Sequence, residues 1–166
     1  MFGLGIKLSI KVGLISLGCP KNLVDSEIIL SNLSTHGFIL VNNPKEADII
    51  IINTCCFIKT AKDESTQTIV EMGLIKTEGI CKGIIVTGCY SERYKDKIFD
   101  DFPFVDGIIG TGELERLPDA INNILQGNRT KFFGEVGYAK SNFNRDIIST
   151  PSHTAYIKIA EGCDNR

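Results

Sequence analysis

The chain has 166 residues, of which 43% are hydrophobic and 23% charged, and its net charge is −2 at neutral pH. This balance is typical of a soluble globular protein with one domain and a remainder. It gives no electrostatic basis for direct nucleic-acid binding, and no apolar run is long enough to cross a bilayer. We therefore expect a cytoplasmic protein without membrane attachment.

The first ten residues are fairly apolar and are expected to form a loose N-terminal extension. One alternative is a lipoprotein signal that ends at Cys19. Two lysines, Lys7 and Lys11, interrupt the apolar stretch, and residues 12–17 fit a first buried strand better.

Short apolar runs alternate with helical patterns along most of the chain. Five runs predict buried strands, at residues 12–17, 38–41, 48–53, 83–87 and 106–110. The helical stretches are 23–35 with Asn22 as N-cap, 59–76, 91–99 capped by Ser91, and 117–125. This alternation predicts an α/β fold, with a mostly parallel five-stranded sheet covered by helices on both faces, as in flavodoxin-like proteins.

The composition changes after Gly127. We expect a domain over residues 11–127, and then a linker over 128–153, with or without a hairpin, because Gly, Asn, Ser, Thr and Pro occur there without a sustained period. Residues 154–166 are expected to begin another domain, with a first strand at 156–159.

Six cysteines are many for a chain of this size. Because no secretory signal is recognised, metal binding or thiol chemistry is favoured over disulfides. Cys19, Cys55 and Cys89 each follow a predicted strand, and parallel strands have their carboxyl ends at one edge of the sheet. Gly18 and Gly88 would let a bulky cluster approach the backbone. The helix N-termini that follow are expected to lower the pKa values of these thiols.

Two other interpretations of the three cysteines compete with this hypothesis. The three cysteines could be separate buried thiols, or they could bind zinc, although zinc usually takes four ligands and often uses Cys-x-x-Cys pairs. Three thiolates with an open fourth position suit an iron–sulfur cluster better. Cys56 could replace Cys55 as a ligand, but we interpret Cys56 as structural, and likewise Cys81, which precedes its strand.

Glu27 falls on the apolar side of its predicted helix, where an acid needs a partner. One interpretation is compensation of the helix dipole in the first turn. The other is a supporting role near the site, in which Glu27 holds a loop around Cys19. Asn22 and Asn53 are expected to support the ligands in the same way.

Several motifs resemble the RimO-type radical-SAM methylthiotransferases, which modify a ribosomal protein. They are SLGCPKNLVDSE at 16–27, NTC at 53–55 with FI at 57–58 and AKDES at 61–65, TGC at 87–89 with SERY at 91–94, GTGE at 110–113, TPSH at 150–153 and AYIKIAEGCDNR at 155–166. The resemblance covers the chain from about residue 11 onward.

The resemblance implies a full set of cofactors and partners. Cys19, Cys55 and Cys89 match the ligands of an auxiliary 4Fe–4S cluster, and Cys163 matches the first cysteine of the CxxxCxxC motif that binds the SAM-cleaving 4Fe–4S cluster. Such enzymes use S-adenosyl-L-methionine to methylthiolate the β-carbon of an aspartate in small-subunit ribosomal protein twelve. They take electrons from a donor such as flavodoxin or ferredoxin.

The sequence also departs from the family pattern. It ends at Arg166, before the second and third cysteines of CxxxCxxC, so we expect the 166-residue chain alone to be inactive. Cys56 stands where a glycine is usual, and Tyr90 where a leucine is usual. A stand-alone iron–sulfur binding module without radical chemistry is the alternative function. A flavodoxin-like nucleotide binder is disfavoured, because no Gly-rich phosphate loop follows the first strand.

Overall fold

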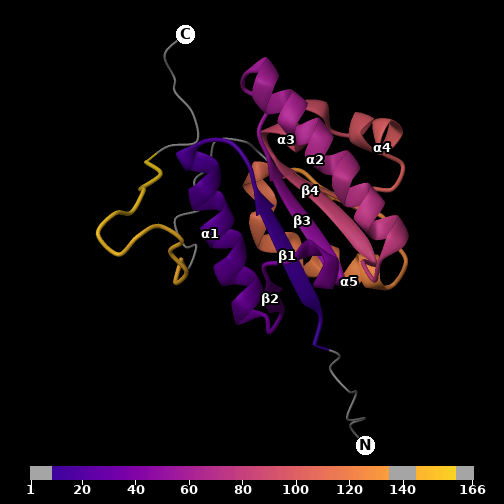
Figure 1. Ribbon diagram of the computed structural model, residues 1–166, viewed down its shortest axis with the longest axis horizontal. Helices are drawn as coiled ribbons and strands as arrows, with labels where there is room; N and C mark the ends of the chain where they lie inside the picture. The colour runs from indigo at the N-terminus through magenta and orange to yellow at the C-terminus, as the bar shows by residue number, and fades with distance from the viewer. Residues whose placement is uncertain (1–8, 135–144, 160–166) are drawn as a thin grey trace, which may run out of the picture.

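The computed structural model describes residues 9–134 and 145–159, and its centre is a parallel six-stranded sheet (Figure 1). The strand order is β2-β1-β3-β4-β5-β6. The strands are β1 (Lys11–Ser16), β2 (Ile39–Val41), β3 (Ile49–Thr54), β4 (Gly83–Gly88), β5 (Gly107–Ile109) and β6 (Thr130–Phe132). The predicted α/β fold of flavodoxin-like type is confirmed, with one strand more than expected.

Helices cover both faces of the sheet. They are α1 (Pro20–Thr35), α2 (Lys59–Glu78), α3 (Cys89–Tyr94), α4 (Lys97–Asp101) and α5 (Leu117–Leu125), with 3₁₀ turns η1 (Pro44–Glu46) and η2 (Thr111–Arg116). The central strand β3 shows why two layers form. Ile49 and Ile51 pack into a core shared with α1 and α5, whereas Ile50 and Ile52 pack into a second core shared with α2, α3 and α4. All four side chains are fully buried, as expected of a strand covered on both faces.

The sixth strand lies inside the region predicted to be a linker. β6 pairs in parallel with β5 over three residues, and the backbone N–H of Gly110 donates to the carbonyl of Phe132 at 2.8 Å. Strand β6 reads Thr-Lys-Phe, and only Thr130 is buried. A three-residue edge strand of this kind has too short a pattern for recognition from sequence, because its context decides its structure.

Two helix boundaries differ from those predicted. α1 begins at Pro20, which suits the first helical position, and its N-cap is Cys19, so Asn22 is no cap. The expected helix over 91–99 is divided into α3 and α4 at Lys95, whose φ of 44° breaks the helical path. Ser91 lies within α3, and its hydroxyl donates to backbone carbonyls. The predicted helix over 117–125 is confirmed.

Residues 145–159 follow the outer side of α1 (Figure 1). No strand is present at 156–159, contrary to the expectation, because no neighbouring strand pairs with these residues and an unpaired strand is not stable alone. Residues 1–8 of the expected extension and 160–166, with Cys163, lie outside the described residues. No helix among the described residues is long and apolar enough to span a bilayer.

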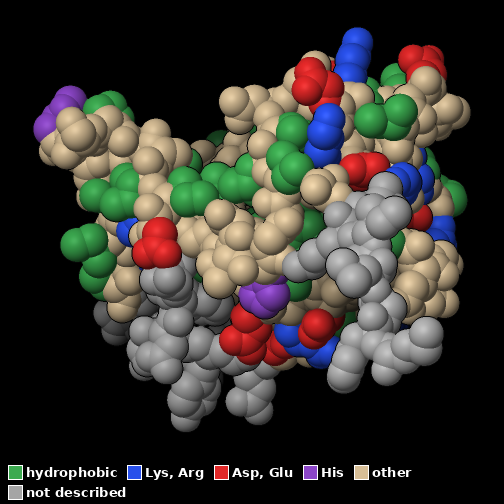
Figure 2. All heavy atoms as spheres, turned by 90° about the horizontal axis from the view of Figure 1, so that it is seen from below, with side chains coloured by type: hydrophobic (Ala, Val, Ile, Leu, Met, Phe, Trp, Pro, Cys, Tyr) green, Lys and Arg blue, Asp and Glu red, His purple; other side chains and the backbone are tan. Residues whose placement is uncertain are grey.

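Acidic and basic side chains lie next to one another on the face shown in Figure 2, with hydrophobic side chains between them. The described part of this face therefore shows mixed charge, consistent with the small net charge of the chain.

Candidate metal centre

A hollow of about 1000 Å³ opens at the carboxyl ends of β1, β3 and β4, and Cys19, Cys55 and Cys89 all line it. The strand order reverses between β1 and β3. In open α/β sheets this reversal creates a crevice in which ligands bind. The topology thus brings together three thiols that lie far apart in the sequence, and it does so at the place where such folds hold ligands.

Each cysteine takes its position from a strand end. Cys19 is the exposed N-cap of α1, and Cys89 is the first residue of α3 and is partly buried. Cys55 directly follows β3 and is buried. The hydroxyl of Ser65, on α2, donates to the carbonyl of Cys55 at 2.7 Å and accepts from its N–H at 3.1 Å. The backbone of Cys55 is therefore fastened to the helix that follows it.

Two glycines let the three cysteine loops approach each other. Gly18 and Gly88 both have φ of +91°, a conformation that L side chains rarely adopt. A Cβ on Gly18 would lie 2.5 Å from Cβ of Cys55, and a Cβ on Gly88 would lie 2.3 Å from the carbonyl oxygen of Thr54. From the sequence, the small residues at these positions are expected to let a cluster approach the backbone. The structure adds that the loops pack directly against one another.

Asn22 and Asn53 connect the same loops through buried amides. The Asn22 amide donates to the carbonyl of Leu17 at 3.0 Å and to that of Thr54 at 2.9 Å. The Asn53 amide donates to the carbonyl of Asn22 at 2.8 Å and to the hydroxyl of Ser26 at 2.9 Å. Both asparagines therefore join the end of β3 to the loop that carries Cys19 and to the first turns of α1.

The expected lowering of thiol pKa values is wrong for Cys89. Burial raises the pKa of Cys89 above its usual value, and the ammonium of Lys21 opposes this effect without overcoming it. The neighbouring thiols Cys55, Cys56 and Cys19 raise the pKa further. Loss of solvation is therefore the largest influence on the pKa of this thiol.

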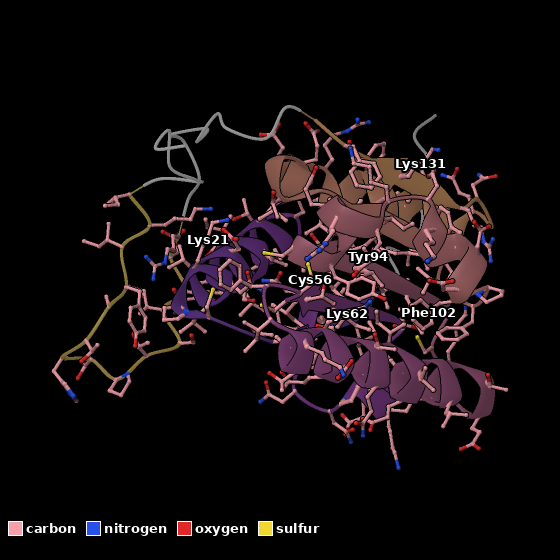
Figure 3. The ribbon with its side chains drawn as sticks, turned by 90° about the horizontal axis from the view of Figure 1, so that it is seen from above. Lys21, Cys56, Lys62, Tyr94, Phe102 and Lys131 are labelled. Atoms are coloured by element: carbon pink, nitrogen blue, oxygen red, sulfur yellow. The ribbon has the colours of Figure 1, made fainter. Side chains whose placement is uncertain are left out.

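Cys56 and Cys81 are not among the residues that line the hollow. The thiol of Cys56 donates to the carbonyl of Cys89 at 3.2 Å and packs in the core beneath α2 and α3. In Figure 3 it lies on the side of the sheet where Lys62 stacks over the ring of Tyr94. Burial raises the pKa of the Cys56 thiol. Cys81 precedes β4, is buried, and its thiol donates to the carbonyl of Gly83 at 3.3 Å.

Within residues 9–134 and 145–159, no three His, Cys, Asp or Glu side chains lie close enough together to hold a single metal ion. A tetrahedral zinc site needs such convergence. An iron–sulfur cluster is larger, and three thiolates would each bind a different one of its irons, so the ligands surround a space. Three cysteines around a hollow therefore suit a cluster better than a single ion.

Among the described residues, Glu27 accepts its hydrogen bonds from Arg145 and Ser149 and none from the loop around Cys19. α1 begins at Pro20, so Glu27 lies beyond the first turn, and the interpretation as first-turn dipole compensation is wrong. Its carboxylate is fully buried and accepts hydrogen bonds from Arg145 and from Ser149. Sequence reasoning missed both partners, because they belong to a segment without periodic pattern and lie more than a hundred residues away.

Comparison with known proteins places the chain in a family. Residues 11–110, which contain all three cysteines, match the model described as "Uncharacterized protein family UPF0004". A protein of Pelotomaculum thermopropionicum named ribosomal protein uS12 methylthiotransferase RimO is 45% identical over 96% of this chain and 36% of its own length.

A protein of the same name from Clostridium kluyveri is 48% identical over 94% of this chain and 35% of its own length. A third relative of this name, from Lachnoclostridium phytofermentans, is 46% identical over 93% of this chain and 35% of its own length. The chain thus spans about a third of the length of these curated relatives. The resemblance to RimO-type proteins is confirmed, and the chain belongs to the family described as "Uncharacterized protein family UPF0004".

Proposed function

We propose that this chain binds one 4Fe–4S cluster through Cys19, Cys55 and Cys89, as part of an enzyme that methylthiolates ribosomal protein twelve of the small subunit. The observation that carries the proposal is that these three thiols line one hollow at the reversal of strand order. The names of the relatives support the reaction and its substrate. Cytoplasmic localisation follows from a ribosomal substrate.

The residues around the hollow have separate tasks in this proposal. The three cysteines bind the cluster as thiolates, and their loops stay together because Gly18 and Gly88 permit close packing. Phe57 and Ile58 are exposed at the hollow and form an apolar part of its wall. Lys21 and Glu64 also line the hollow. The Lys21 ammonium lowers the cost of holding thiolate charge at Cys89.

When bound, such a cluster leaves one iron free to carry the sulfur that the enzyme transfers. Cys163 would supply a first ligand to the second cluster, the one that binds S-adenosyl-L-methionine, with electrons from a donor such as flavodoxin or ferredoxin. The target atom would be the β-carbon of an aspartate. Each of these steps is what the family resemblance implies.

Anaerobic reconstitution with iron and sulfide tests the proposal directly. The expected result is about four irons and four sulfides per chain, the content of a 4Fe–4S centre. Single substitutions Cys19→Ala, Cys55→Ala and Cys89→Ala should each abolish this content. Cys56→Ala and Cys81→Ala are matched controls that should retain it, and urea unfolding checks that every variant is folded. Full cluster content in Cys55→Ala, with loss in Cys56→Ala, would move the ligand to Cys56.

A second experiment separates the enzyme from the stand-alone cluster module. Reconstituted chain, SAM and a strong reductant are incubated under argon, and 5′-deoxyadenosine is measured. The chain alone should form none, whereas a fusion to the remaining part of the Pelotomaculum relative should form it. A fusion that loads both clusters and still forms none would favour the stand-alone module. Turnover by the chain alone, lost in Cys163→Ala, would contradict the expected inactivity.

A further inference from the structure

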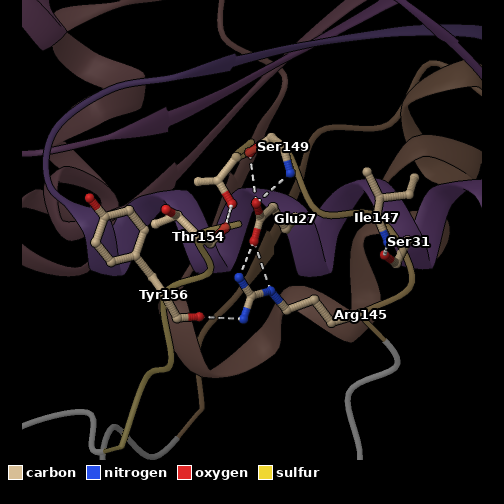
Figure 4. A network of polar contacts seen from close by, with 8 residues as sticks. Glu27, Ser31, Arg145, Ile147, Ser149, Thr154 and Tyr156 are labelled. Carbon is tan, nitrogen blue, oxygen red and sulfur yellow. Dashed lines mark hydrogen bonds and ion pairs between the residues drawn. The ribbon is translucent and has the colours of Figure 1, made fainter. Parts of the chain in front are cut away.

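The outer side of α1 carries a carboxylate that is fully buried on a helix at the surface. Glu27 has no exposed surface and lies at hydrogen-bond distance from four donor groups (Figure 4). They are Nε of Arg145 at 2.7 Å, Nη2 of the same residue, the backbone N–H of Ser149 at 2.6 Å and its hydroxyl at 2.7 Å. All these donors belong to residues 145–159, which we call the strap.

Two further contacts fasten the strap along the same helix. Ser31 lies one turn beyond Glu27, and its hydroxyl oxygen accepts from the backbone N–H of Ile147 at 3.0 Å. Towards the start of α1, Asp25 forms an ion pair with Lys158 at 2.5 Å, and both side chains are largely buried. Arg145 also donates to the carbonyl of Tyr156 at 2.6 Å, so the two parts of the strap are joined.

The fully buried state of Glu27 depends on the strap. A buried carboxylate without partners is costly, and its partners among the described residues come from the strap. If the strap leaves, water reaches Glu27 and Ser31 and replaces the lost hydrogen bonds. The core beneath α1 is built from other side chains, including Ile29 and Leu33. Strap release therefore should cost little domain stability.

The end of the strap lies beside the cysteine-bearing end of α1. Residues 156–159 line a small hollow of about 220 Å³ together with Pro20, Lys21 and Val24. Lys21 also lines the hollow of the three cysteines. The strap thus forms a wall next to the helix end that follows Cys19.

We propose that Glu27, with Asp25, is a positioning residue that clamps the strap along α1 and fixes the strap's end beside the cysteine hollow. The clamp itself is independent of the cluster. Its effect on the cluster rests on the function proposed above. Two ion pairs and their neighbouring hydrogen bonds hold the strap at three positions along the helix, at Asp25, Glu27 and Ser31.

Limited trypsin digestion of the full chain measures the clamp without any cluster. Glu27→Gln keeps the shape of the side chain and removes its charge. Cleavage after Arg145 should become about tenfold faster or more, which corresponds to about 1.4 kcal/mol. Glu46→Gln is the matched control, because Glu46 is exposed and contacts a nearby asparagine, and it should leave the rate unchanged. Unchanged cleavage in Glu27→Gln would overturn the proposal.

Two further measurements distinguish a clamp from a general contribution to the core. Cleavage after Lys158 should rise in Glu27→Gln and in Arg145→Gln, and the double variant should be no faster than either single one. Hydrogen exchange should rise in the strap and the first turn of α1, while the midpoint of thermal unfolding moves little. A large drop in the midpoint, with exchange raised throughout α1, would mean that Glu27 merely stabilises the domain.

The cluster gives the final readout in reconstituted protein. The electron paramagnetic resonance spectrum of the reduced cluster should change in Glu27→Gln and stay the same in Glu46→Gln. An unchanged spectrum with a released strap would refute the positioning role while leaving the clamp intact. If the unmodified chain assembles no cluster, the proposed function fails, and the digestion results still decide the clamp.

Discussion

Replacement of Gly88 by alanine tests whether the cysteine loops are packed as tightly as they appear. Two effects of an alanine at position 88 add in lowering the free energy of unfolding. At φ of +91° and ψ of −163°, a conformation that only glycine commonly adopts, an L residue costs about 1–3 kcal/mol, and forcing a methyl group into packed atoms costs about 1–3 kcal/mol. The new Cβ would lie 2.3 Å from the oxygen of Thr54 and 2.5 Å from Oδ1 of Asn53. We expect Gly88→Ala to lower the free energy of unfolding by about 2–6 kcal/mol.

Gly127 provides a matched control within the same chain. Its φ is +85°, but no atom lies within 4 Å of the position of its Cβ. Gly127→Ala should therefore cost only the backbone strain, about 1–2 kcal/mol. Urea unfolding of reduced, cluster-free protein measures both variants, and a larger loss in Gly88→Ala reports the steric clash together with the backbone strain at ψ of −163°. Equal losses in the two variants would show that the loops at Thr54 and Gly88 separate easily, which would refute the reasoning.

Three further predictions concern neighbouring positions. Gly18→Ala should lower the iron content after reconstitution, because its Cβ would displace Cys55, and iron analysis beside a urea melt checks this. Asn53→Ala should lower the free energy of unfolding by about 1–3 kcal/mol, because two buried hydrogen bonds are lost; a loss below experimental error would contradict this. For Asp48, burial raises the pKa, but bonds from Lys82 and a backbone N–H outweigh burial and hold the pKa below its usual 3.8. The stability that the Asp48 carboxylate contributes is therefore fully present above pH 3.8 and is lost as the pH falls through the lower pKa of the folded protein. In urea melts, the native chain should be more stable than Asp48→Asn at neutral pH, and this advantage should vanish in acid.

Local patterns were sufficient to predict the central part of the fold. The run of isoleucines in β3 requires cover on both faces, and this already implies helices on two sides of a parallel sheet. Strand ends then determine where Cys19, Cys55 and Cys89 gather. The helix α5 was predicted with its observed bounds, because Pro118 marks its first turn and Gly127 follows its end.

Contacts between distant segments were not predictable in the same way. Strand β6 depends on the free edge of β5, and the strap depends on polar groups of α1. Glu27 and Arg145 are 118 residues apart, and neither position belongs to a periodic pattern that links it to the other. The acid on the apolar side of α1 was a signal that a partner was missing. The identity of that partner required the three-dimensional structure.

The helix α1 contacts both the cysteine loops, whose position the sequence predicted, and the strap, whose position it did not. At its start, Asn22 holds the carbonyls of Leu17 and Thr54, and therefore the loops of two cysteines. Five residues beyond Asn22, about 7.5 Å along the axis, Glu27 holds the strap. A helix moves as a rigid unit over this distance, so a shift imposed by the strap must also move Asn22 or break its hydrogen bonds. Because the Asn22 amide donates to the carbonyl of Thr54, next to Cys55, we expect a shift of α1 to change the geometry of the cysteine hollow.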